Sequence, residues 1–303
     1  MSVLVVGSVA LDSVETPFGQ VNDALGGSGT YFSTSASFFA DVKLVAVIGE
    51  DFPAEHLDFL RHRKVDLEGL QKASGKTFRW EGRYEYDLNE AHTLNTYLNV
   101  FESFHPDLPE SYKSAEYVFL GNIDPELQLE VLKQVDNPKL VACDTMNFWI
   151  SGKRDALIET LGYVDMLVIN EAETRQLAEE ANLVKAAQKV MAMGPRILVI
   201  KRGEYGVLMF AENSIFSLPA YPLESVFDPT GAGDTFAGGL IGHLAAQDTL
   251  GEDDLRRAIV YGSVMASYNV ENFSLDRLRE LTFADIEARF ESFRHLTSFQ
   301  SLS

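Results

Sequence analysis

The chain has 303 residues, of which 46% are hydrophobic, and this is enough to bury a large core within one domain that carries an inserted piece. Its 25 Lys and Arg against 45 Asp and Glu give a formal net charge of −20, which disfavours nonspecific binding to nucleic acid or to an anionic membrane. The one cysteine, Cys143, excludes an internal disulfide, and no apolar stretch reaches the roughly 18 residues of a membrane span. We therefore expect a cytoplasmic protein that binds neither nucleic acid nor membrane.

Apolar strand patterns alternate with helical patterns along most of the chain. Strands are expected at about residues 3–9, 43–48, 116–121, 139–144, 165–169 and 196–201, and helices near 30–40, 125–135, 153–161 and 171–193. A hairpin over 206–210 and 214–217 and a helical C-terminal part follow. Buried strands separated by helices are typical of a mostly parallel sheet covered on both faces. The sequence therefore predicts a single three-layer α/β/α domain over residues 1–303.

One region interrupts this alternation. Residues 77–86 alternate large apolar with charged side chains, and residues 93–100 do the same, which indicates an antiparallel β insert with one solvated face. Residues 13–25 are expected to add another strand. The segments at about 13–25 and 76–101 therefore form one small β-sheet insert, which is either a lid whose closure excludes water from a site or a surface hairpin that does not move.

Three polar residues fall at the ends of predicted strands. These residues are Asp12, Asp144 and Asn170. Ligands of open α/β sheets bind beyond the carboxyl ends of the strands, so we expect these side chains to line one crevice.

The most informative segment is residues 228–236, which read Asp-Pro-Thr-Gly-Ala-Gly-Asp-Thr-Phe and lead into an apolar helix. Gly231, Ala232 and Gly233 are expected at the helix N-terminus, where N–H groups lack intrahelical partners and the helix dipole attracts an anion. Small side chains let a phosphoryl group approach the backbone closely. The carboxylate of Asp234 would be repelled by that phosphate, which favours a role as a base toward an incoming hydroxyl. The two parts together favour phosphoryl transfer; the alternative is a packing loop with a dipole-stabilising acid.

This nine-residue run closely resembles the signature of the ribokinase-like (PfkB) family of carbohydrate and nucleoside kinases. Further segments resemble the family in its own order, from Val3 to about Ala266. The resemblance implies a ribokinase-like fold and an enzyme that transfers the γ-phosphate of ATP to a hydroxyl. In that reaction Asp234 is the general base, the amides of residues 231–234 form the anion hole, and ATP and Mg²⁺ are the cofactors. Because family lids sometimes pair between subunits, a homodimer through the lid is also possible.

The same resemblance assigns the ligand-binding residues. It places the substrate at Asp12, Gly26 and Gly27, and the nucleotide at Asn170, Lys201, Gly203 and Gly206. It assigns Glu173 to Mg²⁺ through water, and Asp228 and Thr230 to a possible monovalent cation site, so that K⁺ could stimulate the enzyme.

Two departures from the family pattern bear on the substrate. Ribokinases carry Lys-Gly-Ala-Asn where this chain reads Ser-Gly-Thr-Tyr over residues 28–31, so Tyr31 replaces a sugar-binding amide and leaves room for a stacked ring such as a nucleobase. Many sugar kinases of the family carry a basic residue near Asp144, but here none follows before Lys153, which favours a neutral substrate. A kinase of another small alcohol such as a vitamin precursor, a sugar-phosphate kinase, and a noncatalytic ligand-binding regulator remain open.

Overall fold

The computed structural model describes residues 1–212 and 214–298. A large, mostly parallel sheet runs through the molecule in the strand order β14-β13-β12-β11-β10-β9-β1-β4-β5, with β6 paired to β4. In this sheet β13 pairs with β12 and with β14 in antiparallel fashion, and the other described pairs are parallel. The strands are β1 Ser2–Val6, β4 Asp41–Ile48, β5 Val65–Asp66, β6 Leu70–Lys72, β9 Tyr117–Leu120, β10 Leu140–Cys143, β11 Met166–Asn170, β12 Ile197–Lys201, β13 Val207–Ala211 and β14 Ser214–Leu218.

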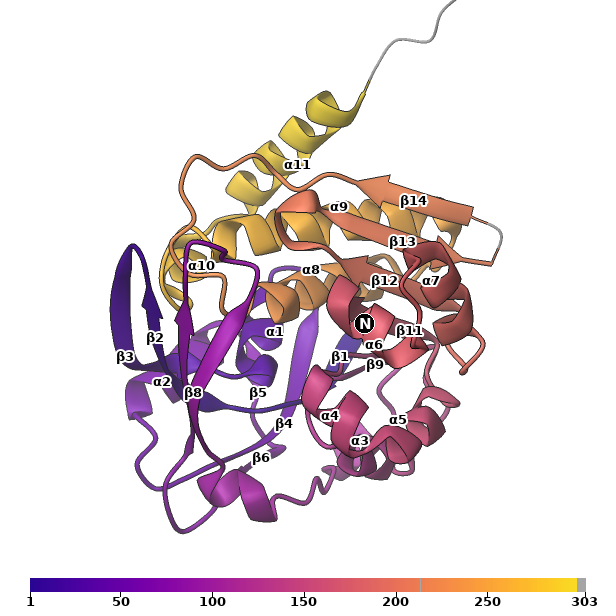
Figure 1. Ribbon diagram of the computed structural model, residues 1–303. Coiled ribbons are helices and arrows are strands. Elements are labelled where there is room, and N and C mark those ends of the chain that lie inside the picture. The colour runs from indigo at the N-terminus through magenta and orange to yellow at the C-terminus, as the bar shows by residue number, and fades with distance from the viewer. Residues whose placement is uncertain (213, 299–303) are drawn as a thin grey trace, which may run out of the picture.

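Helices cover both faces of this sheet (Figure 1). Alternate residues of β1 enter two separate hydrophobic clusters: Val3 and Val5 pack with side chains of α1, α8, α9 and α11, and Leu4 and Val6 pack in the cluster that holds side chains of α3, α5, α6 and α7. Burial on both faces explains why the parallel strands read as unbroken apolar runs. The three-layer α/β/α prediction is therefore confirmed.

The helices are α1 Ser28–Ala36, α2 Ala54–His62, α3 Pro125–Leu132, α4 Asn147–Gly152, α5 Arg154–Leu161, α6 Glu171–Ala178, α7 Leu183–Met191, α8 Ala232–Gln247, α9 Glu252–Asn269, α10 Asp276–Glu280 and α11 Phe283–Thr297. Short 3₁₀ turns lie at Asn99–Ser103, Glu110–Tyr112 and Gly203–Tyr205. The helix expected over 171–193 is two helices, because Glu179 adopts a left-handed conformation after α6 and Asn182 caps the start of α7. No helix of the described part of the chain is long and apolar enough to cross a membrane.

The helices α1 and α8 lie in unusually close contact, and glycines of α8 make this possible. A Cβ placed on Gly238 would lie 2.4 Å from the carbonyl oxygen of Phe32, and one on Gly242 would lie 2.9 Å from Cα of Ala36. Any larger side chain at these positions would push the helices apart. The N-terminus of α8 is thereby held beside α1 and the loop that precedes it.

A second, smaller sheet stands beside the large one (Figure 1), with the strand order β3-β2-β7-β8. Its strands are β2 Ala10–Thr16, β3 Gly19–Gly26, β7 Phe78–Tyr84 and β8 Ala91–Tyr97. The sheet that we predicted as a lid is present, and its strands β7 and β8 are antiparallel as expected, whereas β2 and β7 run parallel. Two details of the prediction were wrong. Residues 13–25 form parts of two strands, since Pro17 and Phe18 make a turn, and Asp12 lies inside β2, because the first core strand ends at Val6.

Candidate active site

The loop that the sequence predicts to bind an anion lies at the N-terminus of α8. Gly231 caps the helix with φ = 72°, and a Cβ at this position would lie 2.4 Å from the ring of Tyr31, so glycine is required for both reasons. The N–H of Ala232 donates to the carbonyl of Pro229 at 3.1 Å. Within the described residues, the N–H groups of Gly233 and Asp234 have no backbone carbonyl partner. These two amides are the donors best placed to receive an anion.

Asp234 lies in the first turn of α8, half-buried beside this loop. Removal from water raises the pKa of its carboxyl to about 7; the nearby Asp144 carboxylate adds to the increase, and Lys201 opposes it. A carboxyl group with this pKa can accept a proton near neutral pH and release it again.

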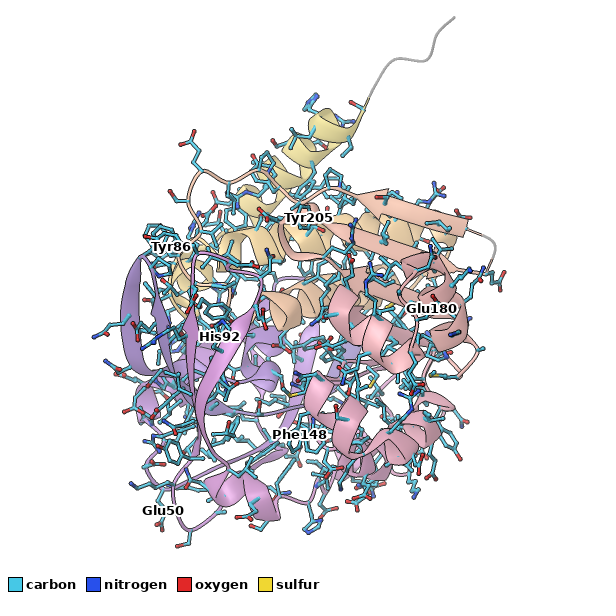
Figure 2. All side chains as sticks on the ribbon, viewed as in Figure 1. Glu50, Tyr86, His92, Phe148, Glu180 and Tyr205 are labelled. Carbon is cyan, nitrogen blue, oxygen red and sulfur yellow. The ribbon has the colours of Figure 1, made fainter. Side chains whose placement is uncertain are left out.

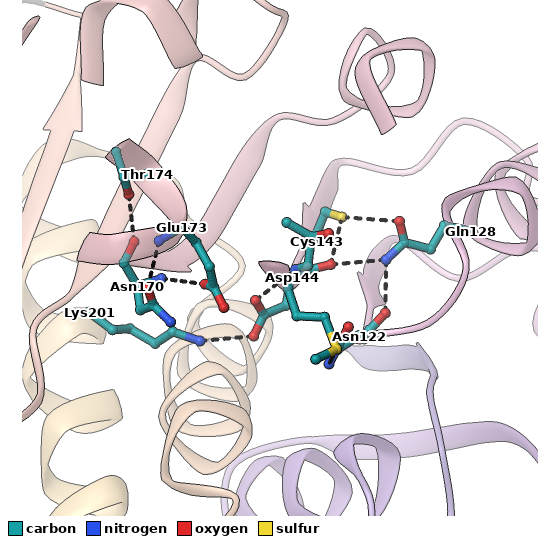
Figure 3. A network of polar contacts seen from close by, with 11 residues as sticks. Asn122, Gln128, Cys143, Asp144, Asn170, Glu173, Thr174 and Lys201 are labelled. Atoms are coloured by element: carbon teal, nitrogen blue, oxygen red, sulfur yellow. Dashed lines mark hydrogen bonds and ion pairs between the residues drawn. The ribbon is translucent and has the colours of Figure 1, made fainter. Parts of the chain in front are cut away.

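The ammonium group of Lys201 is held directly over the loop. Its Nζ lies 2.9 Å from Oδ2 of Asp144, and a Cβ on Gly233 would lie 2.8 Å from the same Nζ. Burial lowers the pKa of Lys201, but the carboxylates of Asp144, Glu173 and Asp234 outweigh burial and raise it, so the group stays charged. Figure 3 shows the ion pair between the ends of β10 and β12. Asp144, which carried no assigned role, therefore positions the cation.

Asn170 and Glu173 lie next to this ion pair (Figure 3) and form a reciprocal cap at the start of α6. The N–H of Asn170 donates to the Glu173 carboxylate at 2.8 Å, and the N–H of Glu173 donates to the Asn170 side chain at 2.8 Å. Burial, with a further contribution from Asp144, raises the pKa of Glu173 to about 7. The cap fixes the Glu173 carboxylate so that it faces the crevice.

The predicted substrate residues Asp12, Gly26 and Gly27 also lie together. A Cβ on Gly26 would lie 1.9 Å from Oδ2 of Asp12, and Gly27 donates its N–H to the same carboxyl. Burial raises the pKa of Asp12 to about 7; the Gly27 bond opposes the increase, and the charges of Asp228 and Asp234 add to it. Asp12 therefore lies near enough to Asp234 for their charges to interact, although Asp12 belongs to the small sheet and Asp234 to α8.

Tyr31 belongs to α1 and is packed beside the anion loop. Its side chain is only 2% exposed, and its ring is packed against Gly231. In this arrangement the ring packs against Gly231 of the anion loop. A substrate role for Tyr31 remains a prediction.

The residues assigned to a monovalent cation form a closed hydrogen-bond network. The Asp228 carboxylate accepts N–H bonds from Thr230 at 2.9 Å and from Ser274 at 3.1 Å, one on each oxygen. The Thr230 carbonyl accepts from the Asn269 amide at 2.8 Å. Each of the three oxygen atoms accepts one bond from a protein donor and keeps a second lone pair, so a monovalent cation at Asp228 and Thr230 stays a prediction.

Two residues of this network were missed by sequence reasoning. Asn269, the last residue of α9, donates to the Thr230 carbonyl and accepts from the Thr235 hydroxyl at 3.1 Å, so it clamps both ends of the anion loop. Tyr84 of the small sheet accepts a bond from the Thr230 hydroxyl at 3.3 Å. Neither has a local motif: both partners are far away in the sequence.

The predicted nucleotide loop follows β12. Gly203 and Gly206 have positive φ angles of 53° and 89°, and the N–H of Arg202 donates to the Gly206 carbonyl at 2.8 Å. A Cβ on Gly203 would lie 1.8 Å from Oδ1 of Asn89, which belongs to the connection between β7 and β8. The tip of the small sheet, marked by Tyr86 in Figure 2, therefore reaches the loop that carries Tyr205.

A helix N-terminus that can hold a phosphate, with a titratable carboxylate and a fixed ammonium group beside it, defines the protein as a phosphotransferase of the α/β class. The sequence pattern of the family described as "pfkB family carbohydrate kinase" matches residues 2–278. The chain therefore belongs to the PfkB family of carbohydrate and nucleoside kinases, whose members transfer a phosphoryl group to an alcohol.

Individual relatives agree with this membership. The chain is 32% identical over 248 residues to a cytidine kinase of Thermococcus kodakarensis, covering 80% of this chain and 87% of the relative. A nucleoside kinase of Burkholderia thailandensis, solved with inosine, superposes with a TM-score of 0.73 at 18% identity and covers 96% and 98% of the two chains. An Escherichia coli structure that contains ATP and Mg²⁺ gives a TM-score of 0.76 at 17% identity over 97% and 99%. These structures confirm the ribokinase-like fold.

The clamp formed by Asn269 leads to a first prediction. Asn269→Ala leaves the buried Thr230 carbonyl and Thr235 hydroxyl without partners, so we expect a loss of about 1–3 kcal/mol of unfolding free energy and a lower kcat. Asn269→Asp, which keeps the shape but removes the donor, should behave similarly. Denaturant unfolding and steady-state kinetics measure both effects, with Asn95→Ala on the outer face of the small sheet as the control. Normal stability and kcat in both Asn269 variants would show that the clamp has no role.

The pKa of Asp234 leads to a second prediction. The folded-state pKa of Asp234, about 7, exceeds the ordinary value of 3.8. Between roughly pH 4 and pH 7 the folded protein therefore keeps a proton on Asp234 that the unfolded chain has already lost. The stability contributed by this group therefore falls as the pH rises through that window. Asp234→Asn cannot ionise, so it should stabilise the protein by about 1 kcal/mol or more at pH 8, and by much less at pH 5. Thermal melts at both pH values test this; an equal difference at the two would contradict it, and Asp253→Asn, at an exposed first-turn position of α9, is the matched control.

Proposed function

We propose that this protein is an ATP-dependent kinase that phosphorylates a hydroxyl group of a neutral nucleoside. The observation that carries the proposal is the position of Asp234 in the first turn of α8, beside N–H groups that have no backbone carbonyl partner among the described residues and beside the Lys201 ammonium. A proton acceptor, the proposed phosphate site and a fixed positive charge then lie side by side. The 32% identity to a cytidine kinase supports a nucleoside over a simple sugar.

In the proposed reaction the Asp234 carboxylate accepts the proton of the substrate hydroxyl. The hydroxyl oxygen forms a bond to the γ-phosphorus, and the bond from that phosphorus to the bridging oxygen breaks, so that ADP leaves. Asp12, with the Gly26 and Gly27 loop, orients the substrate. No covalent enzyme intermediate is needed.

The charge that develops on the transferred phosphoryl group is met by the N–H groups of Gly233 and Asp234 and by Lys201. Because Asp144 holds the ammonium in place before the substrates bind, little reorganisation is required during the reaction. Asn170, Gly203 and Gly206 are the residues that we assign to the nucleotide.

Magnesium would be held chiefly by the nucleotide and water, with Glu173 as a contact through water. Within residues 1–212 and 214–298 no group of three or more His, Cys, Asp or Glu side chains could hold a metal ion by itself, and this fits a cation that binds through substrate phosphates. Bound Mg²⁺ neutralises charge on the β- and γ-phosphates. A monovalent cation such as K⁺ at Asp228 and Thr230 remains a proposal.

The ion pairs that Lys153 forms support a neutral substrate. Its ammonium group forms ion pairs with Asp124, at 2.7 Å, and with Glu126. The first basic residue after Asp144 is therefore already paired, and it is not a free cation for a substrate phosphate.

Pairing of the small sheets of two subunits, through the exposed edge strand β8, also remains a proposal.

The function is tested by Mg²⁺-dependent release of ADP from ATP across cytidine, adenosine, guanosine, inosine, neutral sugars and sugar phosphates. We expect strong stimulation by at least one nucleoside and little by sugar phosphates. Stimulation by a neutral sugar alone or a sugar phosphate alone would contradict the substrate class. ATP binding without stimulation by any compound would favour a noncatalytic regulator.

The role of Asp234 is tested separately with the accepted substrate. Asp234→Asn should lower kcat by about 10²-fold or more, because the amide cannot accept the hydroxyl proton, while nucleotide affinity changes little. Isothermal titration with an ATP analogue measures the affinity, and Asp253→Asn again serves as the control. A kcat within a few-fold of the parent enzyme would remove Asp234 from the role of base.

A further inference from the structure

The small sheet presents one face to the crevice, and the strand register identifies the residues on it. Asp12 of β2 pairs in register with Trp80 of β7, and Val14 pairs with Gly82. Residues in register on neighbouring strands share a face, and alternate residues along one strand do so too. Because the Asp12 carboxyl faces the Gly26 and Gly27 loop, Trp80 lies on the same inner face.

Contacts on both faces of β7 agree with this assignment. Tyr84, four residues beyond Trp80, reaches Thr230 of the anion loop from the inner face. On the outer face the intervening residues bond to other residues of the small sheet and to Asp51: Arg79 to Asp23 and Asp51, Glu81 to Asn95, and Arg83 to Glu15. The indole of Trp80 is therefore placed between the substrate residue Asp12 and the anchor at Tyr84.

The orientation of the indole is fixed by two further contacts. A Cβ on Gly82 would lie 2.0, 2.4 and 2.7 Å from three carbons of the six-membered ring, so the ring lies across Cα of Gly82 and requires glycine there. The indole Nε1 donates to the Thr93 hydroxyl of β8 at 3.2 Å. One ring face therefore covers the strand at Gly82, and the other points away from the strand on the face of the sheet that carries Asp12. Within the described part of the chain, no aromatic ring stacks on this second face.

We propose that Trp80 is the platform on which the base of a nucleoside substrate stacks, with the sugar held at the neighbouring Asp12. This inference rests on the proposed function and specifies how the substrate is recognised. Neighbouring strands are about 4.8 Å apart, so the indole lies within reach of the base of a nucleoside whose sugar is bound at Asp12. Stacking on an aromatic face accepts any base, so the platform separates nucleosides from simple sugars and leaves the choice of base to other contacts.

The test compares Trp80→Leu, which removes the planar face, with Trp80→Phe, which retains a ring. For Trp80→Leu we expect the KM of the best nucleoside to rise about tenfold or more while kcat and the KM of ATP change by no more than a few-fold. Trp80→Phe should restore most of the affinity. A thermal melt of each variant checks that the fold is retained. An unchanged nucleoside KM in folded Trp80→Leu would overturn the proposal.

A second readout does not depend on activity. The chain has two tryptophans, so Trp149→Phe leaves Trp80 as the fluorophore. Titration of this variant with the nucleoside, without ATP, should change the tryptophan emission in a saturable manner, and unchanged emission at saturation, with binding confirmed by calorimetry, would overturn the platform. If the wild-type enzyme phosphorylates no nucleoside, the proposed function and the platform both fail. If it phosphorylates a nucleoside but Trp80→Leu leaves the KM unchanged, the platform alone fails.

Discussion

Crowding of carboxyl groups around one ammonium group is the constraint on which the rest of the site depends. Lys201 is the cation that Asp144 fixes, and the carboxyl groups of Glu173 and Asp234 lie close enough to raise its pKa. Burial and mutual repulsion in turn raise the pKa values of Glu173 and Asp234 to about 7. A triphosphate would bring further negative charge to these carboxyl groups, so Lys201, the loop amides and Mg²⁺ are the positive charges and dipoles that have to offset it.

The small sheet connects the parts of the site. Asp12 of β2 lies at the substrate loop, Tyr84 of β7 bonds to Thr230 of the anion loop, and Asn89 beyond β7 touches Gly203 of the nucleotide loop. One sheet thus contacts the substrate, phosphate and nucleotide segments. A movement of this sheet would change all three contacts together and could in that way couple substrate binding to exclusion of water.

Much of the fold follows from local pattern, whereas much of the site does not. The parallel strands and the Asp234 motif were predicted because apolar runs and a contiguous nine-residue signature are local signals. The prediction that Asp12 ends the first strand was wrong. The strand stops at Val6, before Gly7 and Ser8, and the strand that follows belongs to the small sheet. Residues such as Asn269, Tyr84 and Asp144 were not assigned, since their partners Thr230 and Lys201 lie 39, 146 and 57 positions away along the chain. Only the folded backbone brings these groups together.

The central claim is that Asp234 receives the proton of a hydroxyl group that attacks a phosphate held at the N-terminus of α8. A crystal structure with cytidine, or the nucleoside that the enzyme prefers, and a nonhydrolysable ATP analogue with Mg²⁺ tests it most directly. The account predicts a substrate hydroxyl within about 2.6–3.2 Å of the Asp234 carboxylate and in line with the γ-phosphate. A hydroxyl that lies at another carboxylate, with Asp234 out of reach, would contradict it.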